Sequence, residues 1–230
     1  DAAPFGMPIP APHVIDPLKA SSERFLLLLQ TLDRLTFGPE GMPMPRWVFY
    51  DCAEIPGGIF GFGRPAATLP DDVRDALELP PGYDGLVPFS MYVAIPVRPS
   101  PHPGSAWFGH NLASLNPVFP GLRMKGLASV TKAMALKAFG AGEQIGATQW
   151  DSEALFIHTR FGPLDLVTAW TPAHSEPPTL TYRFDVTDEK IRQALGDPTA
   201  QGPSPPTDFE VAADDHDAMR ALQRRIEAGE

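Results

Sequence analysis

Cysteine is nearly absent from this chain of 230 residues, in which Cys52 is the only one. A single cysteine excludes an intrachain disulfide and a metal site built from several thiolates. One thiol is typical of a reducing compartment, so we predict a cytoplasmic protein. Because the chain begins at Asp1 and not at a methionine, this prediction leaves open a signal peptide removed upstream.

Long hydrophobic runs are lacking too. The longest strongly apolar stretch is Phe25 to Leu29, whereas a membrane helix needs about 18 to 20 such residues. The formal net charge of −10 disfavours a polyanionic partner such as nucleic acid or an anionic membrane. We therefore predict a small-molecule ligand as the partner, with no nucleic acid and no membrane, and the sequence is compatible with a homo-oligomer.

Acidic residues are missing from one part of the chain. Between Gly85 and Gly142 there is no Asp or Glu, although the chain as a whole is acidic. The same segment carries the bases Arg98, Arg123, Lys125, Lys132 and Lys137. A local positive field of this kind favours an anionic ligand such as a carboxylate. The alternative is that these bases pair with acids elsewhere on the surface.

Hydrophobic periodicity and turn residues predict an α+β protein. The predicted helices cover residues 16–37, 71–79, 126–139 and 214–227, and the predicted strands cover 46–52, 86–97, 105–112, 144–150, 154–160, 164–170 and 179–186. The last four strands follow each other about every ten residues, which is typical of an antiparallel meander. We predict an antiparallel β-barrel or strongly curved sheet that encloses a pocket, with flanking helices.

The domain prediction is a single domain over residues 1–230. Within it we expect an extended arm at 1–15, a core at 16–195, a polar, proline-rich linker at 196–213 and a peripheral helix at 214–230.

Two patterns suggest chemistry. Ser129-Val130-Thr131-Lys132 matches the Ser-x-x-Lys arrangement in which a lysine activates a serine, so a serine hydrolase is one hypothesis. In the second pattern, Asp151 follows the end of the predicted strand 144–150. His158 and Arg160 are two residues apart in the predicted strand 154–160, so their side chains would lie on the same face. These three groups could bind a substrate or transfer protons. The alternative is a structural ion pair at the end of a hairpin.

Other polar residues near these predicted strands complete the candidate substrate site. They are His110, Asn111, Gln149, Trp150 and His174. His110, His158 and His174 could together form a metal site across strands, but no close His pair accompanies a carboxylate, so we predict no metal and no cofactor.

Three segments between Asp72 and Tyr182 resemble the acetoacetate decarboxylase-like superfamily. The first is Asp72-Val73-Arg74-Asp75-Ala76-Leu77, followed by Leu79-Pro80-Pro81 and the strand at 88–91. The second is Phe161-Gly162-Pro163-Leu164-Asp165-Leu166-Val167-Thr168-Ala169. Between them lies the lysine-bearing segment 126–137.

The resemblance implies a barrel and a catalytic lysine, for which Lys132 is the candidate. Such a lysine forms a Schiff base with a β-keto acid, and the nearby charges of Lys125 and Lys137 would lower its pKa. Ser90 stands where the family has a glutamate. The resemblance predicts an enzyme of the lyase type, either decarboxylase-like or cyclase-like, acting on an anionic or carbonyl substrate. The alternatives are a noncatalytic small-ligand-binding protein and the serine hydrolase with Ser129 and Lys132.

Overall fold

The structure is a computed structural model that describes residues 19, 22–54, 57–101, 104–171, 178–200, 207 and 209–229. The chain divides into two compact units. The first comprises Asp1–Ile95 with Asn111–Ala135, and the second comprises Pro96–His110 with Leu136–Glu230. Strands β4 (Ser90–Pro99) and β5 (Ser105–Ser114) each run from one unit into the other. The predicted organisation as a single domain stays a prediction.

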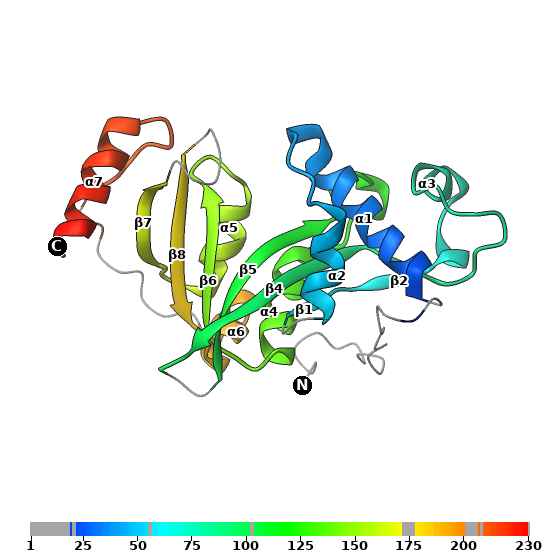
Figure 1. The fold of residues 1–230 in the computed structure, drawn as a ribbon, viewed down its shortest axis with the longest axis horizontal. Coiled ribbons are helices and arrows are strands. Elements are labelled where there is room, and N and C mark those ends of the chain that lie inside the picture. The colour runs from blue at the N-terminus through cyan, green and yellow to red at the C-terminus, as the bar shows by residue number, and fades with distance from the viewer. Residues whose placement is uncertain are drawn as a thin grey trace. The chain divides into compact units, whose positions relative to one another are not determined.

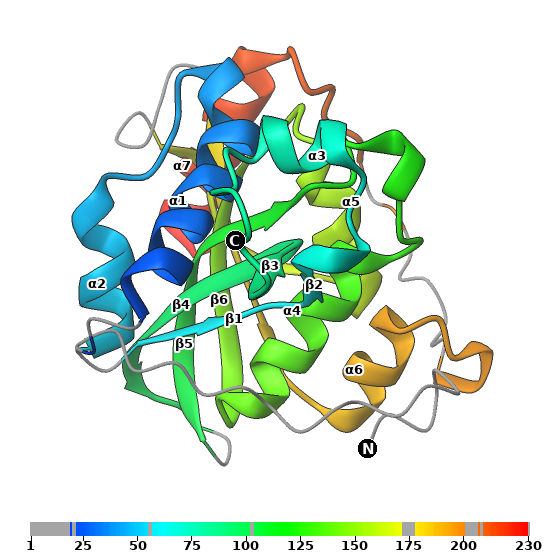
Figure 2. The ribbon, with the colours of Figure 1, turned by 90° about the vertical axis from the view of Figure 1, so that its right-hand side faces the viewer.

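The first unit combines helices with short antiparallel strand pairs. Strand β1 pairs with β4 from Gly58↔Ala94 to Phe60↔Tyr92, and β2 pairs with β3; Figure 2 shows β1 lying along β4. The remaining elements are α1 (Glu23–Phe37), α2 (Arg46–Glu54), β2 (Gly63–Pro65), α3 (Asp71–Ala76), β3 (Leu86–Pro88) and most of α4 (Leu127–Ala138), with β1 at Gly58–Phe60.

The first unit has its core beneath α1. This helix places Leu26, Leu29 and Leu32 toward the interior, where they pack with Phe49 and Phe89. The spacing of these leucines is that of one helical face, so the amphipathic pattern read from the sequence is confirmed over the described part of the helix. The predicted start at residue 16 lies outside the described residues.

The second unit is a sheet flanked by helices. Strand β5 runs parallel to β6, and β8 lies between β6 and β7, antiparallel to both. Figure 1 shows these strands with α7 beside β7. The elements are β6 (Ala141–Gln149), α5 (Ala154–His158), β7 (Asp165–Thr171), β8 (Thr179–Asp185), α6 (Asp188–Ala194) and α7 (His216–Ala228).

The predicted barrel and the predicted antiparallel meander are wrong. The order of strands is β1-β4-β5-β6-β8-β7, so that β1 and β7 are open edges of a mixed six-stranded sheet. The parallel pairing of β5 with β6 explains the error. Two parallel strands need a crossover, which α4 provides here, whereas regular strand spacing along the sequence says nothing about strand direction.

Two predicted strands are helices. Residues 46–52 lie in α2, where Val48, Phe49 and Cys52 are buried; this spacing of three and four residues suits a helix better than the alternation we had inferred. Residues 154–160 form α5 and a 3₁₀ turn. The hydroxyl of Ser152 accepts the N–H of Ala154 at 3.2 Å, which supports a helix start and not a strand. The predicted strands at 86–97, 105–112, 144–150, 164–170 and 179–186 are confirmed within a few residues.

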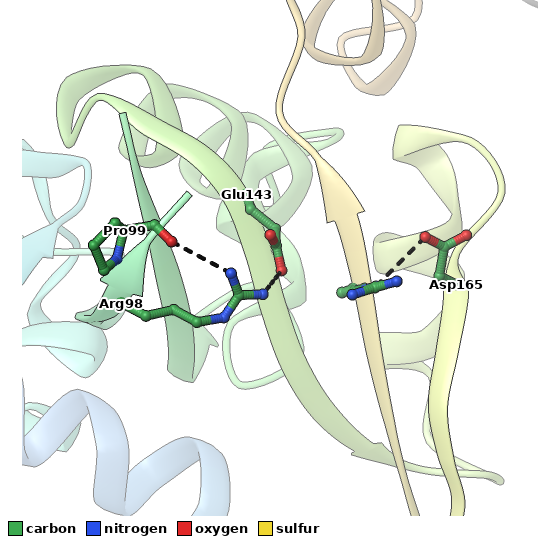
Figure 3. Close-up of polar contacts among 5 residues, drawn as sticks. Arg98, Pro99, Glu143 and Asp165 are labelled. Atoms are coloured by element: carbon green, nitrogen blue, oxygen red, sulfur yellow. Dashed lines mark hydrogen bonds and ion pairs between the residues drawn. The ribbon is translucent and has the colours of Figure 1, made fainter. Parts of the chain in front are cut away.

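One partly buried ion pair crosses the sheet of the second unit. The guanidinium of Arg98 on β4 lies 2.5 Å from the carboxylate of Glu143 on β6 and also donates to the Pro99 carbonyl (Figure 3). Strand β5 lies between β4 and β6 in the sheet, and its Ala106 is the register partner of Glu143. Glu143 is 3% exposed, so this acid has little water to compensate for a lost partner.

Substitution of this arginine is the first test. Arg98→Met leaves a buried carboxylate without its cation, so we expect the free energy of unfolding to fall by about 1–3 kcal/mol. The matched control is Arg183→Met, which breaks a 3.6 Å pair with Asp165 whose two side chains are 52% and 73% exposed; its expected cost is about 0–1 kcal/mol. Urea denaturation compares the two variants, and equal losses would contradict the structural role of Glu143.

Candidate functional site

The loop between β5 and α4 is held in a defined shape by one asparagine. The side-chain amide of Asn116 donates to the Met124 carbonyl at 2.8 Å, and its oxygen accepts the Met124 N–H at 2.9 Å. The Leu115 N–H bonds to the Phe89 carbonyl at 2.9 Å, which attaches the start of the loop to the residue directly before β4. The residues that lead into α4 are therefore fixed without help from a ligand.

The start of α4 has free backbone donors. The Gly126 carbonyl accepts the Val130 N–H at 2.9 Å, and the Leu127 N–H bonds to the Met124 carbonyl at 3.2 Å. Within the described part of the chain, no acceptor is recorded for the N–H groups of Ala128 and Ser129. The first N–H groups of a helix have no partner inside it and need one from outside.

Gly126 keeps the space before these donors open. Its φ of +75° lies in the left-handed region, which glycine adopts at little cost. It offers no side chain to cap the helix, and a Cβ at this position would meet no atom within 4 Å. A small anion could therefore approach the helix start without a steric clash.

Two basic side chains flank this opening. Arg123 and Lys125 are exposed, and neither has an ion pair with another described residue. The helix dipole adds a partial positive charge at the same end. Free N–H groups, the dipole and two cations together form a candidate site for a phosphate-bearing ligand.

Buried hydroxyl groups attach this helix to strand β4. Thr131 donates to the Leu127 carbonyl at 2.7 Å, and its oxygen lies 2.6 Å from Ser90 Oγ. Since Thr131 uses its proton on Leu127, Ser90 must donate to Thr131 and can accept the Phe62 N–H at 3.2 Å. This chain of hydrogen bonds fixes both the direction and the depth of the first turns of α4.

Lys132 lies on the inner side of α4. It is 0% exposed, and its Nζ is 6.0 Å from the ring centre of Tyr92. Burial lowers the pKa of its ammonium group well below the ordinary value of 10.5, because desolvation disfavours the charged form. The like charges of Lys125 and Lys137, from which we expected a lowered pKa, are not needed to explain it.

A second polar group joins α1 to β5. The Asp33 carboxylate is 1% exposed; it accepts the Met44 N–H and the side-chain amide of Asn111, each at 2.7 Å. The hydrogen bond to Asp33 orients the Asn111 side chain so that its NH₂ group faces the carboxylate, because the carbonyl oxygen of Asn111 would be repelled by it. The Asn111 oxygen is consequently directed elsewhere, and it has no hydrogen-bond partner among the described residues.

The candidate residues of the second unit do not form the arrangement we predicted. His158 lies on a helix, is 6% exposed and packs against Tyr182, with ring centres 4.9 Å apart and the ring planes tilted by 34°. Asp151 and Arg160 are exposed. Because the predicted strand is absent, the argument that His158 and Arg160 share a strand face is wrong. A catalytic role for these residues stays a prediction.

The remaining candidates have mixed environments. The Trp150 indole donates to the Ala169 carbonyl at 2.8 Å, Gln149 is partly buried and His110 is exposed. His174 lies outside the described residues. Among the described residues, no group of three or more His, Cys, Asp or Glu side chains could hold a metal ion, and no helix is long and apolar enough to cross a membrane.

Sequence reasoning missed the residues that form the opening at α4. It noted Arg123 and Lys125 only as charges, and it did not single out Gly126 or Asp33. One signal was available: a glycine directly before an apolar helix, preceded by two bases inside a segment without acids.

Comparisons with known proteins give structural similarities only. No family model matches the chain, and no curated protein matches it. A crystal structure of the NatC complex bound to Gag peptide and CoA contains a chain with a TM-score of 0.49 and 12% identity, covering 76% of this chain and 98% of that one. Aminoglycoside 6'-acetyltransferase type Ii has a TM-score of 0.45 and 11% identity, covering 75% and 97%. An acetyltransferase from Agrobacterium tumefaciens has a TM-score of 0.37 and 11% identity, covering 78% and 98%.

These findings correct the predicted family and activity. The resembling structures are not acetoacetate decarboxylase-like proteins, and the open six-stranded sheet is not that barrel. The prediction of a decarboxylase-like lyase is therefore wrong, whereas a catalytic role for Lys132 stays a prediction. The noncatalytic binding protein and the serine hydrolase fit these findings no better. The motifs at 72–91 and 161–169 gave a wrong prediction because the first consists of common helix, turn and strand residues and the second of common turn and strand residues.

The burial of Lys132 generates a test of stability. In the folded state this lysine binds its proton less tightly than in the unfolded chain, so its contribution makes stability rise with pH from the lowered pKa up to about 10.5. We expect Lys132→Met to be more stable than the parent chain near neutral pH by roughly 1–4 kcal/mol, as for other buried charges replaced by apolar groups. The gain should shrink as pH rises toward 10.

Urea denaturation between pH 6 and 10 measures this difference. Lys137→Met is the matched control on the same helix, because Lys137 has a side chain 48% exposed in a 3.8 Å pair with Asp188, and its effect should be small at every pH. A loss of stability in Lys132→Met that does not change with pH would contradict the lowered pKa of this ammonium group.

Proposed function

We propose that this chain is an acyltransferase that binds the diphosphate of a coenzyme A-type acyl carrier at the start of α4 and uses an amine as acceptor. The observation that supports the proposal most directly is the open helix start at Gly126, with two exposed cations beside it. At the identities and TM-scores found, the proposal depends on the chain's own residues and not on the similar structures.

The groups at the helix start fit a diphosphate in number and kind. The N–H groups of Ala128 and Ser129 would donate to phosphate oxygens, and Arg123 and Lys125 would offset the negative charges. The loop that carries both cations is already fixed by Asn116, so little conformational entropy is lost when the ligand binds.

The charge pattern favours a carrier that is bound without a metal. Nucleoside triphosphates are usually held with Mg²⁺, which protein carboxylates help to bind. The segment that forms β5, the loop and α4 has no Asp or Glu between Gly85 and Gly142, so its cations alone are left to balance the phosphates. When bound, a coenzyme A-type carrier supplies an acyl group activated as a thioester.

The pair of Asp33 and Asn111 favours an amine as the acceptor. The carbonyl oxygen of Asn111 needs an N–H or O–H donor, and the nearby carboxylate of Asp33 makes a cationic or strongly polarised donor preferable. Asn111 lies on β5 three residues before the strand ends at Ser114, and Leu115 then begins the loop to α4. Carrier site and acceptor site thus belong to the same unit.

Ligand binding tests the carrier site. We expect coenzyme A to bind in isothermal titration calorimetry, and Arg123→Gln and Lys125→Gln each to weaken binding roughly 10- to 150-fold, since a lost charge-assisted hydrogen bond costs about 1.5–3 kcal/mol. Pantetheine has no diphosphate, so its binding should not respond to either change. The control Arg224→Gln alters an exposed arginine of the second unit. Failure of the parent chain to bind coenzyme A, or equal binding by all variants, would refute the proposal.

Turnover tests the acceptor site separately. With acetyl-coenzyme A and a panel of primary amines, release of the free thiol should fall about tenfold in kcat/KM for Asn111→Leu, as expected for one lost hydrogen bond to a charged group. The affinity for coenzyme A should not change. Arg224→Gln, at an exposed arginine of the second unit, is the control. A parallel loss of coenzyme A affinity in Asn111→Leu would show a structural role instead.

A further inference from the structure

A groove beside α1 lies apart from the residues discussed so far. It has a volume of about 340 Å³ and is bordered by α1 and by the residues that follow α3. Leu27 and Leu77 form its apolar part, and Arg24, Gln30 and Thr31 supply donors. A hollow of this size with a few convergent polar groups is within the range of small-ligand sites. All of its lining residues belong to the first unit.

One donor in this groove has no acceptor. The side-chain nitrogen of Gln30 is buried, and no described residue accepts its N–H groups. Buried amide nitrogens nearly always have a partner in folded proteins, because an unpaired one loses its hydrogen bonds to water without replacement. The missing partner must be an acceptor, and a carboxylate is the strongest acceptor among common groups.

The charges of the groove indicate the same kind of ligand. Arg34 lies 3.1 Å from the carboxylate of Glu78, whereas Arg24 is exposed and has no ion pair with a described residue. Of the two guanidinium groups in the groove, that of Arg34 is thus already paired with a carboxylate, that of Glu78. The guanidinium of Arg24, together with the side-chain amide of Gln30, would form a site for a second carboxylate.

Glu78 has a strained backbone conformation. Its φ of 54° makes it the only described residue other than glycine with a positive φ. It follows α3, where the Leu79 N–H bonds to the Arg74 carbonyl at 3.0 Å, a helix end at which glycine is preferred. A non-glycine residue in this conformation directs attention to its side chain, which here reaches Arg34.

We propose that this groove binds a small carboxylate that carries an apolar chain. The carboxylate oxygens accept hydrogen bonds from Arg24 and the Gln30 amide, and the apolar chain lies on Leu27 and Leu77. Glu78 competes with the ligand for Arg34 and so limits its affinity. This site is independent of the acyl transfer proposed above.

Octanoate is the probe for this proposal, and its binding is followed by isothermal titration calorimetry. We expect Arg24→Gln and Gln30→Leu each to weaken binding about tenfold. Glu78→Gln should strengthen it several-fold, because Arg34 becomes available. This opposite sign distinguishes the proposal from simple unfolding, which could only weaken binding.

The controls separate charge from apolar contact. Octanol and octylamine should bind at least tenfold more weakly than octanoate, and Arg224→Gln should leave octanoate binding unchanged. A short apolar peptide with a free C-terminus, compared with its amidated form, shows whether the carboxylate comes from a fatty acid or a peptide end. The proposal is overturned if neither carboxylate binds, if octanol binds as well as octanoate, or if Glu78→Gln weakens binding.

Discussion

The hydrogen bond between Ser90 and Thr131 attaches helix α4 to strand β4, and the arrangement of the first unit depends on it. Both hydroxyl groups are buried, and each is used as donor and acceptor, so the bond has one possible direction and no competing partner from water. Buried polar contacts of this kind tolerate little displacement, because a broken bond leaves two unpaired groups. The first turns of α4, the orientation of Lys132 and the position of the open N–H groups before it all depend on this one contact with β4.

The sequence predicted most regular elements and little of their arrangement. The helix at 126–139 and the strands near 86, 105, 144, 164 and 179 were found because their apolar periodicity is strong. The open sheet was not, because strand direction is decided by α4 crossing over and by β8 pairing on both sides. Helix α2 was missed since aromatic residues at 47–50 suit either structure, and only tertiary packing of Val48 and Phe49 decides between them.

In the candidate site too, some features could be predicted from the sequence and others only from the fold. The segment without acids was visible in the composition, and it is where the exposed cations Arg123 and Lys125 lie. The role of Gly126 depends on its left-handed φ and on the absence of neighbours, neither of which a sequence displays. Asp33 could not be predicted as a site residue for another reason. It lies on the apolar face of an amphipathic helix, where an acid looks like an interruption until Asn111, 78 positions later, is found beside it.

The position of β8 has a consequence for biosynthesis. This strand bonds to β6 on one side and to β7 on the other, yet it is the last of the three to be synthesised. Until residues 179–185 have emerged from the ribosome, β6 and β7 have no strand between them and their backbone donors and acceptors face water. The sheet of the second unit therefore assembles only after residues 179–185 have been synthesised, and a nascent chain stopped before residue 179 exposes two unpaired strand edges, the kind of surface that chaperones bind.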